Sequence, residues 1–428
     1  MKSAMKSLEW PIGVRLVNVR QPLRAIVDVE PYPRVRVYVA DGPDVIGSVE
    51  ITNARHPISA ARLRHAIVDA HGHRLARRAV EGQLSGAAVD PRLPADVPVS
   101  VIVPTCDRAD DLRRCLESLS AQASVRPVEI VVVDNRPDRG TAREIARAFP
   151  RVTLIEEPRP GLSYARNTGL VAARGAILIT TDDDVVVPPD WIERLVAPFI
   201  RPEVIAVTGN VLPLELESES QCKFEAYGGL GKGFDRLEVN GDWFAGIRGA
   251  VPTWRLGATA NAAFRASAIR NPAIGLMDEA LGAGTPTGCS EDTYFFYRIL
   301  KAGGTILYEP SVYVWHRHRT SMADLRAQIY SYSKGHVAYQ LTTLFRDGDR
   351  RALVRLGWSL PKAYLRRAVE RARGQSDYPL DLLALEILGN MAGPFALWRS
   401  RRRVRRLGTG PTVRDDSVRP NPALHDVA

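Results

Sequence analysis

Three consecutive carboxylates, Asp182, Asp183 and Asp184, come two threonines after an apolar run at residues 176–179. Adjacent negative charges repel one another, so this arrangement suits either a solvated turn or a divalent cation that takes oxygen ligands. On composition alone the solvated turn is the commoner explanation, because short motifs specify sites loosely. The position favours the cation, because open α/β sheets bind their ligands at the carboxyl ends of buried strands. The sequence therefore predicts a ligand site at this point.

Other polar residues follow apolar runs in the same way. Thr105, Asp107 and Arg108 come just after the β-branched run at 99–103, and Asp134 follows the next apolar run. The carboxyl ends of parallel strands meet at one edge of a sheet, so a nucleotide laid across that edge would meet these side chains in turn. Neither a Walker A sequence nor G-x-G-x-x-G accompanies them, which argues against a P-loop and a standard dinucleotide fold.

The elements that must position these residues alternate between strand and helix patterns. Continuous apolar runs are typical of parallel strands covered on both faces, and amphipathic stripes such as Leu112 to Leu119 lie between them. This alternation predicts βαβ units and a mostly parallel sheet with helices on both faces. The expected strands span residues 99–103, 128–133, 152–155, 176–180, 204–208, 211–212, 305–308 and 312–315.

The first part of the chain has a different pattern, with short β-branched runs separated by Pro, Gly and Asp. We predict a small β-rich domain and a linker over residues 1–97, followed by a catalytic domain over 98–320. The expected N-terminal elements are strands at 14–19, 25–29, 35–39 and 45–51, a helix near 60–70 and a linker at 82–98.

Composition limits the class of protein. The 428 residues are 45% hydrophobic and 25% charged, which excludes a disordered chain and allows two or three domains. The formal net charge is +10, densest in the last third, which indicates an anionic membrane surface or phosphorylated ligand, with nucleic acid less favoured. The four cysteines form no CxxC pair, which argues against a disulfide framework or structural zinc and suits a reducing cytosol. The polar start predicts no secretory signal.

These motifs, taken in order, resemble family 2 glycosyltransferases with the GT-A fold. The resemblance covers about residues 98–320, and the ordered set is more specific than any single motif. It implies a nucleotide-sugar donor, a divalent metal bound through a D-x-D element, and an inverting displacement. The residues that carry it are 99–108 (VSVIVPTCDR), Asp134-Asn135, 161–169 (GLSYARNTG), Asp182-Asp183-Asp184 and Ser290-Glu291-Asp292.

The resemblance also implies a role for each matching residue. Asp184 and Asp182 match the metal-binding pair and His316 a third ligand, for Mg²⁺ or Mn²⁺, with a His ligand favouring Mn²⁺. Asp292 matches the general base, with Glu291 beside it. The alternative for Asp292 is a cap or dipole partner at a helix N-terminus. The implied donor-binding residues are Pro104, Thr105, Asp107, Arg108, Asp134, Arg166, Asp182, Asp183, Ala260 and Asn261.

The C-terminal region, residues 321–407, has a helical pattern. A basic amphipathic stretch precedes an apolar segment at 379–398, which contains Asp381 and Glu386 and so argues against a true membrane span. Six arginines follow within 399–406. This order predicts peripheral contact with the cytoplasmic face of a membrane. The alternative is a helical cap packed on the catalytic domain with a solvated basic tail. We expect disorder over 408–428.

The leading functional hypothesis is a metal-dependent inverting glycosyltransferase of the hexosyl- or deoxyhexosyltransferase class. No Q-x-x-R-W sequence follows His318, which favours transfer of one sugar over chain extension. The expected acceptor is a glycan, a lipid-linked or a small molecule, in glycan, cell-envelope or glycolipid synthesis. The alternatives are a nucleotidyltransferase on a similar fold and a non-catalytic scaffold that binds membrane or nucleic acid. The candidate base Asp292 argues against the first, and the intact acidic residues argue against the second.

Overall fold

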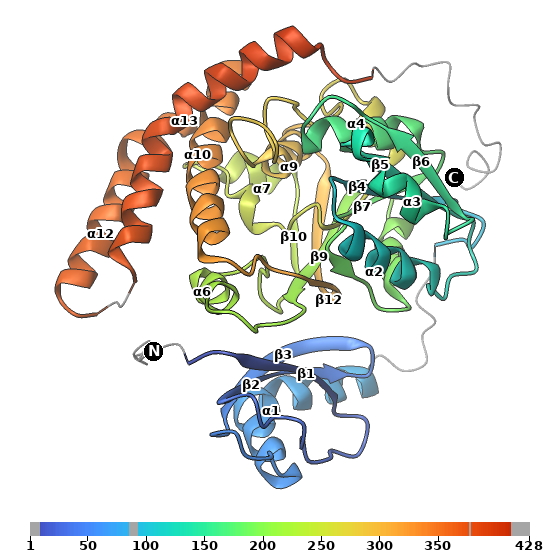
Figure 1. Ribbon diagram of the computed structural model, residues 1–428, viewed down its shortest axis with the longest axis vertical. Coiled ribbons are helices and arrows are strands. Elements are labelled where there is room, and N and C mark those ends of the chain that lie inside the picture. Colours follow the sequence, from blue (N-terminus) through green and yellow to red (C-terminus); the bar gives the residue numbers. More distant parts are fainter. Residues whose placement is uncertain (1–8, 85–92, 376–377, 412–428) are drawn as a thin grey trace.

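The computed structural model describes residues 9–84, 93–375 and 378–411. These residues form a small N-terminal module, a central α/β unit and a set of C-terminal helices along one side (Figure 1). Part of the expected linker and most of the tail predicted to be disordered lie outside the described residues.

The N-terminal module is a three-stranded sheet covered by one long helix. Strand β2 lies in the middle, parallel to β1 and antiparallel to β3. Alternate β2 residues such as Val37 and Val39 are buried in a cluster with Leu63 and Ile67 of the helix. The elements are β1 (Ile12–Asn18), β2 (Arg34–Asp41), β3 (Asp44–Thr52) and α1 (Ala60–Leu84).

Two expectations for this module are wrong. No strand forms at 25–29, because the backbone there pairs at a single point, where Ile26 bridges Ile58. The helix also runs well beyond the expected end near residue 70. The module rests on the central unit through a 2.6 Å ion pair between Arg36 and Glu225, and through Tyr38, whose ring packs edge-on against Trp315.

The central unit is built on a nine-stranded mixed sheet in the order β10-β12-β9-β11-β7-β4-β5-β6, with β8 paired to β12. Six described strands run in one direction, whereas β8, β10 and β11 run antiparallel to their neighbours. The mostly parallel α/β sheet expected from the sequence is therefore confirmed. Its strands are β4 (Val99–Thr105), β5 (Val128–Asp134), β6 (Val152–Glu156), β7 (Ile177–Thr181), β8 (Val185–Val186), β9 (Val204–Pro213), β10 (Leu237–Val239), β11 (Asn261–Arg265) and β12 (Thr305–His316).

Helices cover both faces of this sheet, and the alternation of β4 shows why. Val101 packs on one face with Leu112 of α2 and Trp191 of α5, whereas Ile102 packs on the other with Ala165 of α4 and Phe295 of α9. The helices are α2 (Ala109–Ser120), α3 (Thr141–Ala146), α4 (Leu162–Ala172), α5 (Trp191–Val196), α6 (Glu219–Tyr227), α7 (Gly241–Gly246), α8 (Ala266–Arg270) and α9 (Glu291–Lys301), with short 3₁₀ turns η1 (Pro137–Arg139), η2 (Ala197–Ile200) and η3 (Thr253–Arg255).

The C-terminal helices pack on the side of the central unit that carries α9 (Figure 1). Helix α13 lies along α10, where Gly389 and Gly393 leave room for the α10 backbone and Val337 to approach closely. Its buried residues include Leu382, Glu386 and Leu397, so one side of α13 is committed to this contact. The elements are α10 (Met322–Asp347), α11 (Arg351–Val354), a π-helical turn η4 (Arg355–Ser359), α12 (Leu360–Ala372) and α13 (Leu380–Leu407).

Candidate active site

The acidic triplet lies at the carboxyl end of β7, as its position after an apolar run predicts. Short strand β8 pairs with the end of β12, with Val185 opposite His316, and this pairing brings His316 beside the triplet. The ligand atoms of Asp182, Asp184 and His316 all lie within 4.8 Å of one another. Two carboxylates and an imidazole from distant parts of the chain therefore converge on one point.

The chemistry of Asp184 fits a cation at this point. Its Oδ1 atom is buried, lies 3.1 Å from His316 Nε2 and accepts no hydrogen bond, while its Oδ2 atom accepts one from Arg108. Burial raises the pKa of this carboxyl, but His316 and Arg108 outweigh that effect and hold the pKa well below its usual range. An ionised oxygen without a donor, beside an imidazole, is a suitable ligand pair for a divalent metal.

Asp183, the middle acid, is directed away from this point. Its Oδ2 atom accepts a 2.7 Å hydrogen bond from Thr105 Oγ1, and its Oδ1 atom lies 3.3 Å from Arg108 Nη1. Burial and the neighbouring charge of Asp184 raise the pKa of Asp183 to about 7. Asp183 thus ties the triplet to the end of β4.

Arg166 on α4 joins the acidic triplet to the candidate base region. Its side chain is buried, and its two Nη atoms donate hydrogen bonds of 2.6 Å to Asp182 and 2.7 Å to Glu291. Burial and the charge of Asp292 raise the pKa of Glu291 to about 7. Through these two contacts Arg166 holds two parts of the site together, and it lines the cleft in which a donor would bind.

Asp292 lies in the first turn of helix α9, and its two oxygens have different surroundings. Oδ1 accepts hydrogen bonds from the backbone N–H (2.6 Å) and the hydroxyl (3.1 Å) of Thr293, a local contact of the kind expected for a helix N-terminus. Oδ2 accepts none from the described residues, and the half-buried side chain lines the same cleft as the acidic triplet. Asp292 therefore retains one oxygen that can accept a proton.

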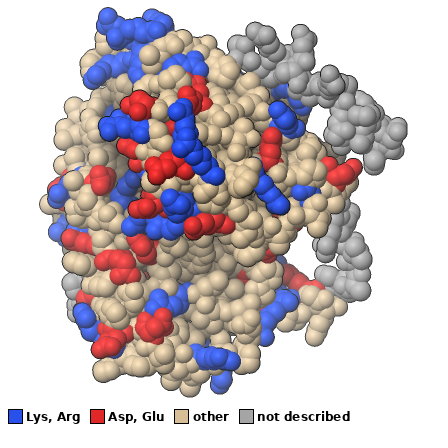
Figure 2. All heavy atoms as spheres, turned by 45° about the vertical axis from the view of Figure 1, so that its right-hand side comes forward, with Lys and Arg blue, Asp and Glu red and all other residues tan. Residues whose placement is uncertain are grey.

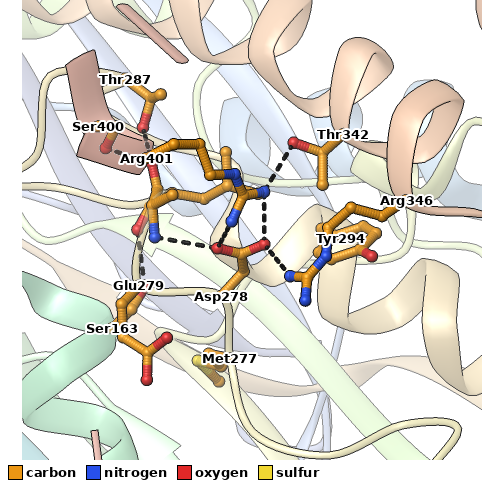
Figure 3. A network of polar contacts seen from close by, with 12 residues as sticks. Ser163, Met277, Asp278, Glu279, Thr287, Tyr294, Thr342, Arg346, Ser400 and Arg401 are labelled. Atoms are coloured by element: carbon orange, nitrogen blue, oxygen red, sulfur yellow. Dashed lines mark hydrogen bonds and ion pairs between the residues drawn. The ribbon is translucent and has the colours of Figure 1, made fainter. Parts of the chain in front are cut away.

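The loop that leads into Asp292 is held by the C-terminal helices (Figure 3). Asp278, which is 5% exposed, accepts hydrogen bonds from Arg401 of α13 and Arg346 of α10. Ser400 donates a 2.6 Å hydrogen bond to the carbonyl of Ala280. Helix α13 thus fixes the backbone at Asp278 and Ala280, at the start of the loop that leads to the candidate base.

One continuous cleft of about 1230 Å³ contains these groups. Eleven of the site residues predicted from the sequence line this cleft, namely Pro104, Thr105, Arg108, Arg166, Asp182, Asp183, Asp184, Ala260, Glu291, Asp292 and His316.

Three predicted donor-binding residues do not line this cleft. The amide of Asn261 is fully buried, donates to the carbonyls of Asn210 and Val312 and accepts from the Trp191 indole, so it holds the sheet together. The Asp107 carboxylate accepts a hydrogen bond from Thr141 outside the cleft. Asp134 is buried and accepts from the backbone of Arg136, while its neighbour Asn135 lines the cleft instead.

The sequence did not identify a second group of cleft residues, which come from the C-terminal helices. No short motif marks them, and the helical amphipathic pattern says only that this region packs somewhere. They include Tyr332, His336, Arg355, Tyr364, Arg367, Glu386 and Asn390.

Known proteins are similar to this chain mainly over the central unit and the beginning of the C-terminal helices. A sequence profile described as Glycosyl transferase family 2 matches residues 100–220, and one described as Glycosyl transferase family group 2 matches residues 177–371. The Pre-mycofactocin glycosyltransferase of Mycobacterium tuberculosis is 28% identical over 243 residues, 55% of this chain and 46% of that protein. Glycosyltransferase AglE of Haloferax volcanii is 38% identical over 119 residues, 26% of this chain and 39% of that protein. The matches thus span less than half of these relatives.

Among solved structures, this fold is similar to that of the mannosyltransferase PcManGT from Pyrobaculum calidifontis, described in complex with GDP-Man and Mn²⁺. The identity is 19% and the TM-score 0.41, over 81% of this chain and 86% of that one. The two family matches together cover the acidic triplet, Asp292 and His316. Residues 100–371 therefore identify this chain as a member of the family 2 glycosyltransferases.

Proposed function

We propose that this chain transfers a single sugar from a nucleotide-diphosphate sugar to an acceptor hydroxyl, with inversion and with a divalent cation. The observation that carries the proposal is the arrangement across one cleft of the Asp182, Asp184 and His316 cluster and of Asp292, joined through Arg166 and Glu291. The presence of both groups of residues in one cavity supports a transfer in which donor and acceptor meet directly.

Each part has a separate chemical task. A cation held by Asp182, Asp184 and His316 would supply positive charge to the departing diphosphate, and the imidazole ligand favours Mn²⁺ over Mg²⁺. Asp292 Oδ2 takes the proton of the acceptor hydroxyl as that oxygen bonds to the anomeric carbon. The bond from this carbon to the donor diphosphate breaks on the opposite side, which inverts the configuration and releases a nucleoside diphosphate. Arg166 and Glu291 hold the acidic triplet and the start of α9 in fixed positions relative to each other.

We further propose that the C-terminal helices hold the enzyme on an anionic membrane surface. Among the described residues, α13 is the one helix that is long and apolar enough to span a membrane. One side of it nevertheless packs on α10. Its opposite side leaves Met391, Phe395 and Trp398 exposed at 74%, 60% and 55%. Such an apolar stripe beside basic residues is typical of helices that lie in the membrane interface.

The positive charge at the end of α13 also favours an anionic membrane surface. Arg401 is paired with Asp278, but no ion pair with a described residue involves Arg399, Arg402, Arg405 or Arg406. Arg399 and Arg402 stack over the rings of Phe395 and Trp398, and they line a groove of about 480 Å³ with those rings. Basic side chains gather at the top of Figure 2, at the height of this end of α13 in Figure 1. The surface would place the enzyme beside a lipid-linked or envelope acceptor on the cytoplasmic face.

The enzymatic proposal is tested by ligand-induced stabilisation followed by a transfer assay. Thermal unfolding is measured with UDP-, GDP- and dTDP-sugars, each with Mn²⁺, with Mg²⁺ and with a chelator. Only a ligand that binds the folded chain raises the unfolding temperature, so one donor with a cation should stabilise it. The stabilising donor is then incubated with envelope extract, and released nucleoside diphosphate is measured. No stabilisation by any nucleotide sugar, or no release above the chelated control, would contradict the proposal.

A further inference from the structure

The cleft is also lined by three side chains outside the acidic triplet, and the part of the cleft at these residues is here named its second arm. Trp254 of η3, His336 of α10 and Arg355 of the π-helical turn η4 line it, and none of them belongs to the predicted site. π-Helical turns are rare and occur often at functional sites.

Among the described residues, Arg355 has no carboxylate partner, which a half-buried guanidinium normally has. Its Nε atom donates a 3.0 Å hydrogen bond to His336 Nε2, and its guanidinium lies 5.4 Å from the Trp254 ring centroid. Within the described chain it forms no ion pair, and its two Nη groups donate no hydrogen bond. Arg367, which lines the same arm, is instead paired with both oxygens of Glu386 at 2.7 and 3.0 Å. Arg355 therefore offers an unused charged fork to the cleft.

His336 adds a second donor to the same place. Because Nε2 accepts the hydrogen bond from Arg355, the ring proton of the neutral imidazole lies on Nδ1, which donates to no described residue. Burial and the charge of Arg355 lower the pKa of His336 to about 3, which keeps the ring neutral. The three side chains thus present N–H donors and an aromatic face, with a single positive charge.

A short series of contacts connects this arm to the candidate base. The Thr253 hydroxyl donates a 2.9 Å hydrogen bond to the carbonyl of Thr293, the residue after Asp292. The next residue, Trp254, packs edge-on against His336 with ring centroids 5.0 Å apart. Arg355 and Asp292 also line the same cleft, so one molecule can place a charged group at Arg355 and a hydroxyl at Asp292.

From this geometry we infer that Arg355, His336 and Trp254 bind an oxyanion of the acceptor, a phosphate or a carboxylate, so that the acceptor is an acidic molecule. The identification of the ligand as the acceptor rests on the proposed function, whereas the binding of an oxyanion at Arg355 does not depend on it. A guanidinium fork matches the paired oxygens of both groups, and the partly desolvated setting strengthens the contact.

The test measures binding of small probes to the full chain in the presence of a chelator, by ligand-observed NMR. The probes are phenyl phosphate, benzoate and the neutral phenol. Arg355→Gln should weaken phenyl phosphate or benzoate by about tenfold or more, the usual scale for a charged hydrogen bond. Arg255→Gln is the matched control, because it removes the same charge from a neighbouring exposed residue that does not line the cleft. It should change binding by less than about twofold.

Equal binding of phenyl phosphate to wild type and Arg355→Gln, or equal binding of phenol and phenyl phosphate, would overturn the inference. Arg355→Lys keeps the charge but lacks the fork, so partial recovery would show that the loss in Arg355→Gln is not misfolding. Decyl phosphate below its micelle concentration separates the sources, since tighter binding than phenyl phosphate indicates a lipid-linked acceptor and equal binding a soluble one. Nucleotide-sugar binding, measured separately, reports failure of the proposed function alone.

Discussion

Arg401, near the end of the last helix, donates hydrogen bonds of 2.6 and 2.7 Å to the two carboxylate oxygens of Asp278, which is almost completely buried. This contact links helix α13 to the loop that leads into Asp292. The C-terminal region is therefore part of the framework of the cleft, whatever surface its outer side meets.

Replacement of Asp278 by Asn should destabilise the fold. The change leaves two arginines facing a neutral amide, and removal of one partner from a buried ion pair costs about 3 to 5 kcal/mol. We expect about 3 kcal/mol, because Arg346 and Arg401 keep access to water. Urea unfolding at pH 7 measures the difference. Asp381→Asn, whose ion pair with Arg326 is exposed, should cost less than about 1 kcal/mol.

The same pair predicts a dependence on pH. Burial raises the pKa of Asp278, but Arg401, the backbone N–H of Ala280 and Arg346 outweigh it and lower the pKa below its usual value. A lowered native pKa adds stability that is complete above the unfolded value, about 3.9, and is lost as pH falls through the folded value. The difference in unfolding free energy between wild type and Asp278→Asn should therefore stay constant from pH 7 to 5 and shrink below pH 4. A difference that grows on acidification would contradict this assignment.

Asp184→Asn should abolish metal-dependent donor binding. The change replaces the ionised carboxylate beside His316 with a neutral amide, and so removes the negative charge that would hold the cation. The thermal shift given by the stabilising nucleotide sugar with Mn²⁺ should disappear. Asp107→Asn, in a carboxylate near the cleft but outside its lining, should keep the shift. Equal shifts in Asp184→Asn and wild type would remove Asp184 from cation binding.

Asp292→Asn should separate donor binding from transfer. The amide keeps the shape of the side chain, and its Oδ1 atom can still accept from Thr293, but it cannot take a proton. Transfer should fall by about 10² to 10⁴, the usual range for loss of a general base, while donor stabilisation is unchanged. Turnover is measured as nucleoside diphosphate released in the presence of acceptor. A variant with wild-type turnover would exclude Asp292 as the base.

The proposed membrane contact predicts flotation with anionic vesicles. The variant Phe395→Ser with Trp398→Ser should lose it, because each apolar side chain contributes about 1.5 to 3 kcal/mol on burial. Val27→Ser with Val125→Ser is the control, since these exposed apolar residues lie elsewhere on the surface. Point variants are preferable to truncation at Gly374, which would also free the Asp278 loop.

Salt dependence separates this contact from other partners. Binding to anionic vesicles should weaken above about 0.3 M salt, because the Debye length is about 10 Å at 0.1 M and shortens as the salt concentration rises. Binding to neutral vesicles should be weak throughout. If the protein stays unbound at low salt and instead self-associates through Phe395 and Trp398, the outer side of α13 contacts a second copy and the membrane proposal is wrong.

The sequence alone located much of the candidate site. An apolar run that ends in Asp182 to Asp184 predicts a strand and a polar edge, because strand period and burial are local properties of the chain. The same logic placed Asp292 at a helix start, and the family resemblance added His316. The structure brings these residues around one cleft.

The tertiary structure decided the rest, for reasons that local sequence does not contain. Asn261 lies in a segment that resembles a donor-binding one, yet the antiparallel pairing of β11 between β7 and β9 directs its amide into the sheet. Arg166 lies within the recognisable motif at 161–169, but only the packing of the chain places it between Asp182 and Glu291. The side of α13 that packs on α10, and so the arm of the cleft at Arg355, depends on contacts between helices far apart in the chain. An apolar helix pattern specifies burial but not the partner.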